Sequence, residues 1–321
     1  MNSEIILIVA GEPNSIFSEI LFKTLDKTNC KKPIILICSN KLLNLQKKKL
    51  NVKKRIKLID YKKLNVSKLD NKSINLINVE YNQKQAFQKI SSKSNKYIEN
   101  CFQLAFKLIK EENIVRFING PISKEYFLKK KYPGITEYIS KHFSIKKTCM
   151  LIFNKNLSVC PVTTHLPIKL VSKKIEKKSI ENKIRLILNF YKKFFKKIPK
   201  IAVLGLNPHC ETVLNYNEDK KIIKPVVLKM KKKGLKVYGP LPADTIFQKN
   251  NRKKYDCILG MYHDQVLTPI KTLFEYDAIN ITLGLPFLRI SPDHGPNERM
   301  MGKNLSNPLS LIQAIKFLEK N

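Results

Sequence analysis

Residues 201–209 read Ile-Ala-Val-Leu-Gly-Leu-Asn-Pro-His, an apolar run of strand length that ends in a polar turn. Similar short runs alternate along the chain with longer stretches of helical periodicity. This is the pattern of βαβ units around a mostly parallel sheet. We therefore predict an α/β fold with strands at Ile5–Ala10, Ile34–Cys38, Ile114–Ile118, Cys149–Phe153, Leu157–Pro161, Ile201–Leu206, Cys257–Met261 and Ile279–Leu283.

The intervals between these runs carry the helical patterns and two apparent breaks. Helices are predicted at Ser15–Thr28, Tyr97–Lys110, Ile168–Lys173, Ile180–Phe195, Val226–Lys233 and Leu309–Lys320. The break Lys-Lys-Lys-Tyr-Pro-Gly near 130–145 and the loop 302–308 suggest crossings between two lobes. We expect a first α/β lobe of residues 1–140 plus 302–321 and a second of 141–301. The Lys- and Asn-rich stretch 41–94 should form short strands and surface, and we assign no chemistry to it.

Length and composition narrow the class of protein. The 321 residues, 43% of them apolar, suffice for one large domain or two ordinary ones with a buried core. The apolar runs are far shorter than the roughly 20 residues of a membrane-spanning helix. The N-terminus has no basic leader and no small-residue cleavage site, so we expect a soluble, cytoplasmic protein. Seven scattered Cys without a CxxC pair indicate reduced thiols.

The formal charge of +36 raises the question of nucleic-acid binding. The excess is almost all Lys, with only six Arg, and it is spread over the whole chain. There is no recognisable nucleic-acid-binding motif, no Trp and no aromatic platform among the basic residues. We interpret the charge as solvated lysine faces and expect neither a specific nucleic acid nor a membrane as partner. The charge would still attract anionic substrates.

Three of the five His follow predicted strands: His165, His209 and His263. Open α/β sheets bind their ligands at the carboxyl ends of the strands. A single loop His is usually only solvated, but three at equivalent positions indicate a divalent metal site, because imidazole is a common ligand of such ions. Three protein ligands leave an open position for a substrate. The neighbouring Asp264 is a candidate to orient an imidazole.

A second group of polar residues lies in the segment 280–295. It contains Asn280, Arg289, Asp293 and His294 on a predicted strand, turn and loop, and Lys271 precedes it. Lysine and arginine side chains suit a phosphate or a carboxylate. The alternative for Lys271 is one more surface lysine. That alternative is weaker for Arg289, because Arg is scarce and this one lies in an apolar segment.

Six motifs in order resemble the 4-hydroxythreonine-4-phosphate dehydrogenase family of pyridoxal phosphate biosynthesis. They read Val-Thr-Thr-His-Leu-Pro, Leu-Gly-Leu-Asn-Pro-His, Gly-Pro-Leu-Pro-Ala-Asp-Thr, Tyr-His-Asp-Gln, Asn-Ile-Thr-Leu-Gly-Leu-Pro-Phe-Leu-Arg and Ser-Pro-Asp-His-Gly. The resemblance also covers Ala-Gly-Glu-Pro from residue 10 and Asn-Gly-Pro-Ile-Ser-Lys from residue 119. It implies a two-lobed fold like that of the isocitrate and isopropylmalate dehydrogenases. The family forms homodimers whose active site lies in the interlobe cleft and is completed by the partner subunit.

The resemblance also assigns roles to individual residues. The metal-binding histidines of the family match His165, His209 and His263. Its substrate contacts match Thr136, Lys271, Asn280 and Arg289, and its cofactor lies near His294 and Gly295. The implied cofactors are NAD or NADP and one divalent ion, Zn, Mg or Co. Lys271 and Asp244 are our candidates for proton transfer; the alternatives are a phosphate anchor for Lys271 and a helix N-cap for Asp244.

The implied reaction is oxidation of 4-phosphohydroxy-L-threonine at its C3 hydroxyl, followed by decarboxylation to 3-amino-2-oxopropyl phosphate. The chain departs from the family pattern at Ile135, where the family usually has His. It also departs in the residues after His209 and in the Pro-Asn-Glu-Arg that follows Gly295. Two alternatives stay open. One is a sister dehydrogenase acting on a four-carbon aldonate 4-phosphate such as erythronate or threonate 4-phosphate. The other is a non-catalytic metal- or nucleic-acid-binding protein.

Overall fold

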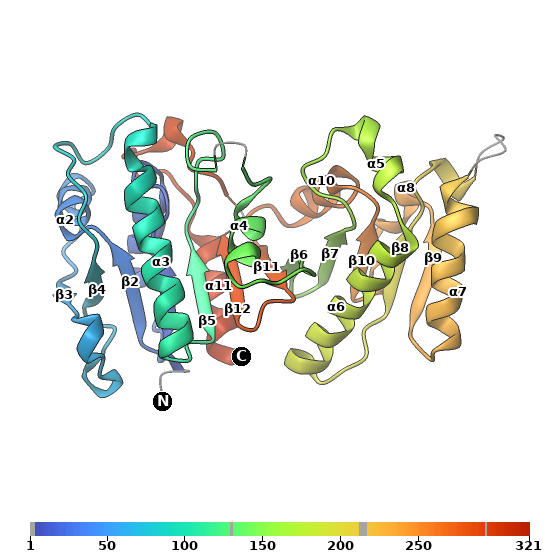
Figure 1. Cartoon of the computed structure of the whole chain (residues 1–321), viewed down its shortest axis with the longest axis horizontal. Helices are drawn as coiled ribbons and strands as arrows, with labels where there is room; N and C mark the ends of the chain where they lie inside the picture. Colours follow the sequence, from blue (N-terminus) through green and yellow to red (C-terminus); the bar gives the residue numbers. More distant parts are fainter. Residues whose placement is uncertain (1–3, 129–130, 212–216, 293) are drawn as a thin grey trace. The chain divides into compact units, whose positions relative to one another are not determined.

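The structure is a computed structural model of the chain that describes residues 4–128, 131–211, 217–292 and 294–321 (Figure 1). Contacts divide the chain into unit 1, Met1–Ile139 with Pro286–Asn321, and unit 2, Ser140–Leu285. The first crossing lies next to the expected one. The return crossing lies at Pro286, whereas we expected it at residue 302.

Unit 1 contains a parallel sheet with the strand order β3-β4-β2-β1-β5-β12. In the central strand β1, Ile8 lies opposite Leu36 on one side and Ile118 on the other. The inner strands are continuous apolar runs because helices cover both faces of such a sheet. The strands are β1 Ile6–Val9, β2 Ile34–Cys38, β3 Ile56–Leu58, β4 Ile74–Asn78, β5 Arg116–Asn119 and β12 Leu288–Pro292.

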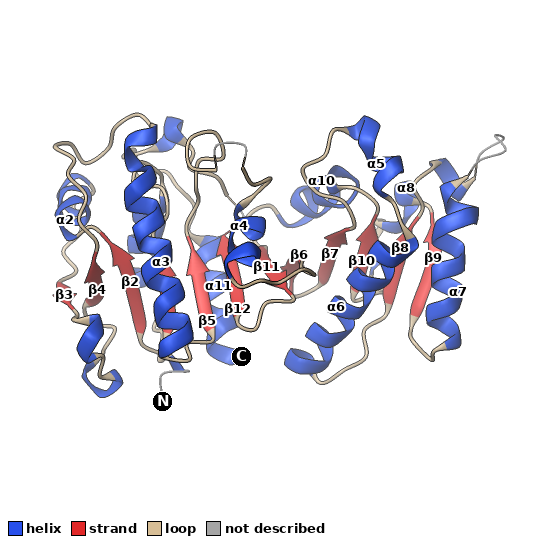
Figure 2. Ribbon diagram, in the orientation of Figure 1, coloured by secondary structure: helices blue, strands red, loops and turns tan. Residues whose placement is uncertain are grey.

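The helices of unit 1 bury one apolar face each. Figure 2 shows α3 in front of the strands of this unit and α11 behind them. Along α3, Ile98, Phe102 and Phe106 recur at helical spacing and are fully buried. The helices are α1 Phe17–Lys27, α2 Asn40–Lys49, α3 Asn95–Glu111, α4 Ile135–His142 and α11 Leu309–Lys320, with short helical turns η2 Tyr61–Lys63, η3 Val66–Lys68, η4 Ser92–Ser94 and η7 Glu298–Met300.

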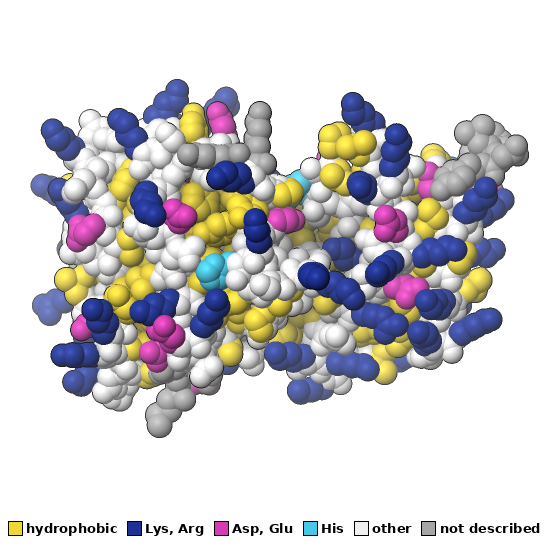
Figure 3. Space-filling model, viewed as in Figure 1, with side chains coloured by type: hydrophobic (Ala, Val, Ile, Leu, Met, Phe, Trp, Pro, Cys, Tyr) yellow, Lys and Arg dark blue, Asp and Glu magenta, His cyan; other side chains and the backbone are white. Residues whose placement is uncertain are grey.

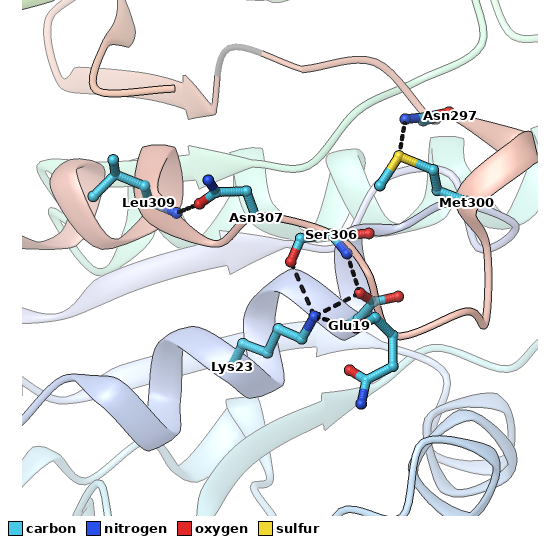
Figure 4. Close-up of polar contacts among 8 residues, drawn as sticks. Glu19, Lys23, Asn297, Met300, Ser306, Asn307 and Leu309 are labelled. Carbon is cyan, nitrogen blue, oxygen red and sulfur yellow. Dashed lines mark hydrogen bonds and ion pairs between the residues drawn. The ribbon is translucent and has the colours of Figure 1, made fainter. Parts of the chain in front are cut away.

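The last segment of the chain belongs to unit 1 because it completes the sheet and packs on α1. Strand β12 pairs with β5, and α11 packs against α1 and β12. Between them, the Lys23 Nζ donates to the carbonyls of Asn304 at 2.8 Å and Ser306 at 3.0 Å, and also contacts Glu19 at 2.9 Å (Figure 4). The Ser306 amide donates to the same Glu19 carboxylate at 2.5 Å. These bonds anchor the loop before α11 to α1.

Unit 2 contains strands in the order β11-β6-β7-β10-β8-β9. Strand β6 is antiparallel to β11 and β7, whereas β7, β10, β8 and β9 run parallel. The parallel strands β7, β8 and β10 are fully buried. The strands are β6 Cys149–Asn154, β7 Leu157–Pro161, β8 Ile201–Leu204, β9 Val237–Leu241, β10 Cys257–Gly260 and β11 Ile279–Leu283.

The helices of unit 2 enclose a core centred on β7, β8 and β10. Buried Val266 and Ile270 of α10 pack on Ile258 and Val159 of the strands. The helices are α5 Ile168–Lys174, α6 Lys177–Phe195, α7 Lys224–Lys232, α8 Ala243–Ile246, α9 Lys249–Arg252 and α10 His263–Phe274, with the helical turns η5 Pro208–Cys210 and η6 Asp219–Ile223.

The α/β prediction is confirmed, and most predicted elements are present. The stretch 41–94 contains β3 and β4, short strands as expected, but also α2, which we did not predict. Strands β9 and β12 and helices α4 and α10 were also missed. The reason is visible in their sequences: Gly and Pro interrupt β9, Arg and Pro interrupt the apolar run of β12, and Pro269 lies inside α10. Packing on neighbouring elements outweighs these local preferences.

The surface agrees with the interpretation of the charge. Figure 3 shows Lys and Arg side chains distributed over the visible face rather than gathered in one patch. All seven Cys are free of disulfides, and all but Cys210 are buried. Within the described residues, no helix combines the length and apolar character that a membrane span requires.

Candidate functional site

The three predicted metal-binding histidines follow three neighbouring strands. His165 follows β7, His209 lies in η5 after β8, and His263 is the first residue of α10 after β10. Strand β10 pairs in parallel with β7 on one side and with β8 on the other. The carboxyl ends of the three strands therefore share one edge of the sheet, where α/β proteins bind their ligands.

Two of these imidazoles lie next to each other. The ring centroids of His165 and His263 are 5.9 Å apart. The Nδ1 of His263 is 2.6 Å from the Asp264 carboxylate, within hydrogen-bond distance. A carboxylate on one ring nitrogen fixes the orientation of an imidazole and leaves its other nitrogen for a ligand. Asp264 thus occupies the orienting position expected from the sequence.

The third histidine lies beside a different carboxylate. The Nδ1 of His209 is 3.8 Å from the Asp244 carboxylate, and both side chains are more than half exposed. Asp244 is not a helix N-cap: Pro242 holds that position in α8, and no side chain caps the helix. Asp244 therefore lies beside His209 and does not cap α8.

Imidazole nitrogens with nearby carboxylates suit a divalent ion such as Zn or Co. In the described part of the chain, no three His, Cys, Asp or Glu side chains lie close enough together to hold a metal ion. Binding such an ion requires His209 to join the pair formed by His165 and His263.

Backbone strain marks the same loops. His165 has a φ of 52° and His209 a φ of 53°, and Cys210 follows with a φ of 62°. Residues with a Cβ rarely adopt this left-handed region, and such strain clusters at functional sites. Surrounding bonds must hold these residues in place.

Two buried polar side chains supply bonds that hold the strand ends. Asp219 is fully buried and accepts the backbone amides of Leu206 at 2.7 Å and Asn207 at 3.1 Å. Gln265 donates to the Gly205 carbonyl at 2.8 Å and accepts the Met261 amide at 2.7 Å. Gln265 thus ties the end of β8 to the end of β10, which carry His209 and His263.

The other site residues of unit 2 lie on α10 and β11. Lys271 is exposed in the last turn of α10, about 12 Å along the helix axis from His263. Asn280 lies on β11 opposite Ile152. Its Oδ1 is buried and lacks a hydrogen-bond partner among the described residues. A buried acceptor of this kind is available to a ligand that donates a hydrogen bond.

The predicted substrate contact Arg289 is completely buried in unit 1. Its Nε donates to the Asn119 Oδ1 at 2.7 Å, and its Nη1 donates to the Thr136 hydroxyl at 3.3 Å. Burial lowers the pKa of the Arg289 guanidinium to about 10, while the negative charge of Glu137 opposes this shift. The group stays charged at neutral pH and provides a fixed positive charge behind Thr136, which is only half-buried.

Sequence reasoning missed Asn119 as the partner that orients Arg289. Asn119 is the last residue of β5. Its side-chain Nδ2 donates to the Gly120 carbonyl at 2.8 Å. The sequence did contain a signal for a functional role of Asn119: it ends an apolar run and directly precedes Gly120 and Pro121.

The predicted cofactor residues also lie in unit 1. The Nδ1 of His294 is 3.0 Å from the Gly295 carbonyl oxygen. Among the described residues other than Gly295 and its chain neighbours, no atom lies within 4 Å of the position that a Cβ on Gly295 would take. Asp293, the carboxylate of the same sequence motif, lies outside the described residues.

Comparison with known proteins settles the family. Residues 29–318 match the family described as "Pyridoxal phosphate biosynthetic protein PdxA". The chain belongs to this family. A 4-hydroxythreonine-4-phosphate dehydrogenase of Sulfurihydrogenibium sp. is 38% identical over 97% of this chain and 96% of that protein. A D-threonate 4-phosphate dehydrogenase of Salmonella typhimurium is 30% identical over 92% of each chain.

A solved PdxA-family structure supports the same fold. The 4-hydroxythreonine-4-phosphate dehydrogenase of Klebsiella pneumoniae superposes with a TM-score of 0.85 at 27% sequence identity, over 99% of this chain and 98% of that chain. The two-unit α/β architecture of this chain is therefore that of the PdxA family.

Proposed function

We propose that this PdxA-family chain is an NAD(P)- and metal-dependent dehydrogenase that oxidises 4-phosphohydroxy-L-threonine at its C3 hydroxyl. The resulting β-keto acid loses CO₂ to give 3-amino-2-oxopropyl phosphate, a step of pyridoxal 5′-phosphate biosynthesis. The observation that carries the proposal is the placement of His165, His209 and His263 at the carboxyl ends of three adjacent parallel strands. The family match and the 38% identical relative support the choice of substrate.

The residues at these strand ends suit a divalent ion, Zn, Mg or Co, held by the three imidazoles. Such an ion would polarise the C3 hydroxyl and stabilise the negative charge that develops during decarboxylation. NAD or NADP near His294 and Gly295 would accept the hydride from C3. The hydride would carry both electrons from C3 to the nicotinamide, while the hydroxyl proton goes to a protein base.

Two side chains of unit 2 are our candidates for these proton transfers. Asp244 lies beside His209 and is exposed, so it is positioned to accept the hydroxyl proton. Lys271 is exposed on α10 and can supply a proton to the carbon that loses CO₂, or bind the phosphate instead. A kcat loss without a change in the substrate KM on Lys271→Met would favour proton transfer; a raised KM would favour phosphate binding.

The substrate carries a phosphate, a carboxylate and an amine, and the chain offers polar side chains that suit these groups. The Thr136 hydroxyl, oriented by Arg289, suits a phosphate or carboxylate oxygen. The buried Oδ1 of Asn280 suits a donor such as the substrate amine or hydroxyl. We propose that Thr136, Lys271, Asn280 and Arg289 together select the substrate, in a cytoplasmic homodimer.

A second candidate substrate is a four-carbon aldonate 4-phosphate. The 30% identical D-threonate 4-phosphate dehydrogenase supports it, as does Ile135, which replaces the imidazole usual in the family. An aldonate lacks the amine, so it would not need a neighbouring acceptor for one.

Reduction of nicotinamide tests both candidates. The purified protein is mixed with NAD or NADP and either 4-phosphohydroxy-L-threonine or D-threonate 4-phosphate, before and after treatment with a chelator and re-addition of metal. We expect reduction with the first substrate that is lost with the chelator and restored by Zn, Mg or Co. Reduction with only the aldonate would move the assignment to the sister enzyme. Absence of reduction with both would refute the proposed function.

A further inference from the structure

Glu12 is a buried carboxyl group in the turn after β1, and no step of the proposed reaction uses it. Its exposed fraction is 1%. One oxygen accepts the Asn14 amide at 3.2 Å, and the other accepts the Ser94 hydroxyl at 3.2 Å. Ser94 lies directly before α3, so Glu12 connects the turn 11–16 to the start of that helix.

Close backbone contacts and side-chain hydrogen bonds connect the turn 11–16 to its surroundings. Gly11 has a φ of +78°, and a Cβ there would lie 2.3 Å from the Pro121 carbonyl oxygen. The Ser15 hydroxyl donates to the Glu12 carbonyl at 2.8 Å. The Asn14 and Gln83 side chains exchange two hydrogen bonds, of 3.1 Å and 2.9 Å. The Glu12 side chain is the ionisable member of this buried polar network.

The same turn contacts the predicted cofactor segment 294–298. The Ile16 amide donates to the Pro296 carbonyl at 3.0 Å. Two residues further on, the Glu298 carboxylate accepts the Ile90 amide at 2.6 Å. The segment is therefore attached to the turn at Pro296 and to the chain before α3 at Glu298.

The charged surroundings of Glu12 are acidic or neutral. Glu298 lies near enough to repel it, and Tyr81 is the other titratable side chain whose pKa responds to Glu12. Tyr97 and Cys38 line a cavity of about 20 Å³ with Glu12. None of these described neighbours is a cation. Burial raises the pKa of Glu12 to about 7, although the hydrogen bonds from Asn14 and Ser94 lower it; the negative charge of Glu298 adds a smaller rise.

We propose that Glu12 is a positioning residue for the cofactor segment: its carboxyl group fixes the turn 11–16 against Ser94, and the turn fixes residues 294–298 through the Ile16–Pro296 hydrogen bond. Burial favours the neutral carboxyl group in this arrangement, so ionisation of Glu12 loosens it, because a buried carboxylate loses its hydration. Cofactor affinity therefore falls as the pH rises through neutrality. This inference rests on the proposed function, because it takes the segment as the cofactor site.

Three variants test the inference. Glu12→Ala removes the carboxyl group. Glu12→Gln keeps the shape and stays uncharged at every pH, with one acceptor oxygen and one amide donor in place of the two carboxyl oxygens. Glu111→Ala changes an exposed glutamate at the opposite end of α3 and serves as the matched control. For each, the cofactor KM and kcat are measured between about pH 6 and about pH 8. Backbone amide exchange of Ile16 and of residues 294–300 is measured without ligands.

We expect Glu12→Ala to raise the cofactor KM by about tenfold with little change in kcat, and to speed exchange in both segments. In Glu12→Gln the exchange stays slow and the cofactor KM no longer rises with pH. If Glu12→Ala does not fold, the pH profile of Glu12→Gln decides. A cofactor KM in Glu12→Gln that rises with pH as in the wild type would overturn the proposal.

A merely structural role for Glu12 would give a different result. The KM values for cofactor and phosphorylated substrate would then rise together in Glu12→Ala. Amide exchange would not become faster specifically at Ile16 and residues 294–300. In that case the inference would fail. The exchange measurement also separates the two hypotheses. If the wild type reduces no nicotinamide with either substrate, the proposed function fails, whereas exchange in the ligand-free variants still decides whether Glu12 fixes the segment.

Discussion

Unit 2 presents exposed histidines after its strands, whereas unit 1 keeps charged side chains buried. His165, His209 and His263 are accessible or partly accessible and lie on strained or helix-initiating backbone. Arg289 and Glu12 are at most 1% exposed, and protein groups bind them. The two units therefore differ in whether these polar side chains are exposed or buried.

The exposed and the buried side chains are expected to have different roles. Exposed imidazoles with nearby carboxylates can bind a ligand directly, and their removal should affect chemistry more than stability. Buried charged groups with internal partners fix neighbouring residues, and their removal should affect stability and binding together. Each prediction below tests whether removal of a residue affects chemistry, as expected for the exposed group, or stability and binding, as expected for the buried group.

The largest effect is expected for His209→Ala. Loss of a metal ligand removes several kcal/mol of transition-state stabilisation, so kcat/KM should fall by about a thousandfold or more. The midpoint of thermal unfolding should change little, because the side chain is exposed. Steady-state kinetics and calorimetry check both parts, with His142→Ala as the control. Wild-type turnover of metal-stripped His209→Ala would refute the metal mechanism.

The raised pKa of Glu12 should make the free energy of unfolding depend on pH. Its pKa is raised from 4.5 to about 7 in the folded protein, so its stabilising contribution is complete below pH 4.5 and is lost as the pH rises through about 7. The shift corresponds to about 3 kcal/mol of unfolding free energy. Urea unfolding of the wild type and Glu12→Gln over this range measures it. Parallel pH profiles in the two proteins would contradict the assignment.

Arg289→Lys should destabilise unit 1 despite keeping the charge. A lysine cannot donate from a planar fork to both Asn119 and Thr136, so about 2 kcal/mol of unfolding free energy should be lost. The KM for the phosphorylated substrate should rise because Thr136 loses its orientation. Arg252→Lys, whose guanidinium makes a single bond to the Phe247 carbonyl, is the control. Equal stability of the two variants would show that the two Arg289 bonds contribute nothing.

The smallest effect is expected for Asp264→Asn. The amide keeps the shape but is a weaker acceptor for the His263 ring, so Zn affinity should fall by roughly tenfold. Competition with a coloured chelator measures the affinity, and the surface variant Asp60→Asn is the control. Unchanged Zn affinity would mean that Asp264 does not orient His263.

Uninterrupted apolar runs predicted their elements well. Strand β2, which reads Ile-Ile-Leu-Ile-Cys, has the predicted bounds, because a continuous apolar run of strand length has few alternatives to the interior of a sheet. The positions of the three histidines followed from these runs. Helix α10 could not be predicted in the same way: Pro269 normally ends a helix, and only the packing of Val266 and Ile270 on β7 and β10 maintains it.

The buried charged groups were harder to predict. Arg289 was noticed because it interrupts an apolar segment, but its partner Asn119 is distant in sequence. Glu12 was missed altogether, although it directly follows an apolar strand and a glycine. Periodicity identifies which backbone is buried, but the environment of a single carboxyl group depends on Ser94 and Glu298, which tertiary structure brings to it.

The return of residues 286–321 to unit 1 has a consequence for the order of synthesis. Unit 2 is one continuous segment, whereas unit 1 needs β12 and α11 to complete its sheet and cover α1. On the ribosome, unit 2 emerges whole while unit 1 still lacks a strand, a helix and Arg289. Asn119 and Thr136 therefore lack their cationic partner until Arg289 has been translated, so unit 1 completes its fold after unit 2 has emerged.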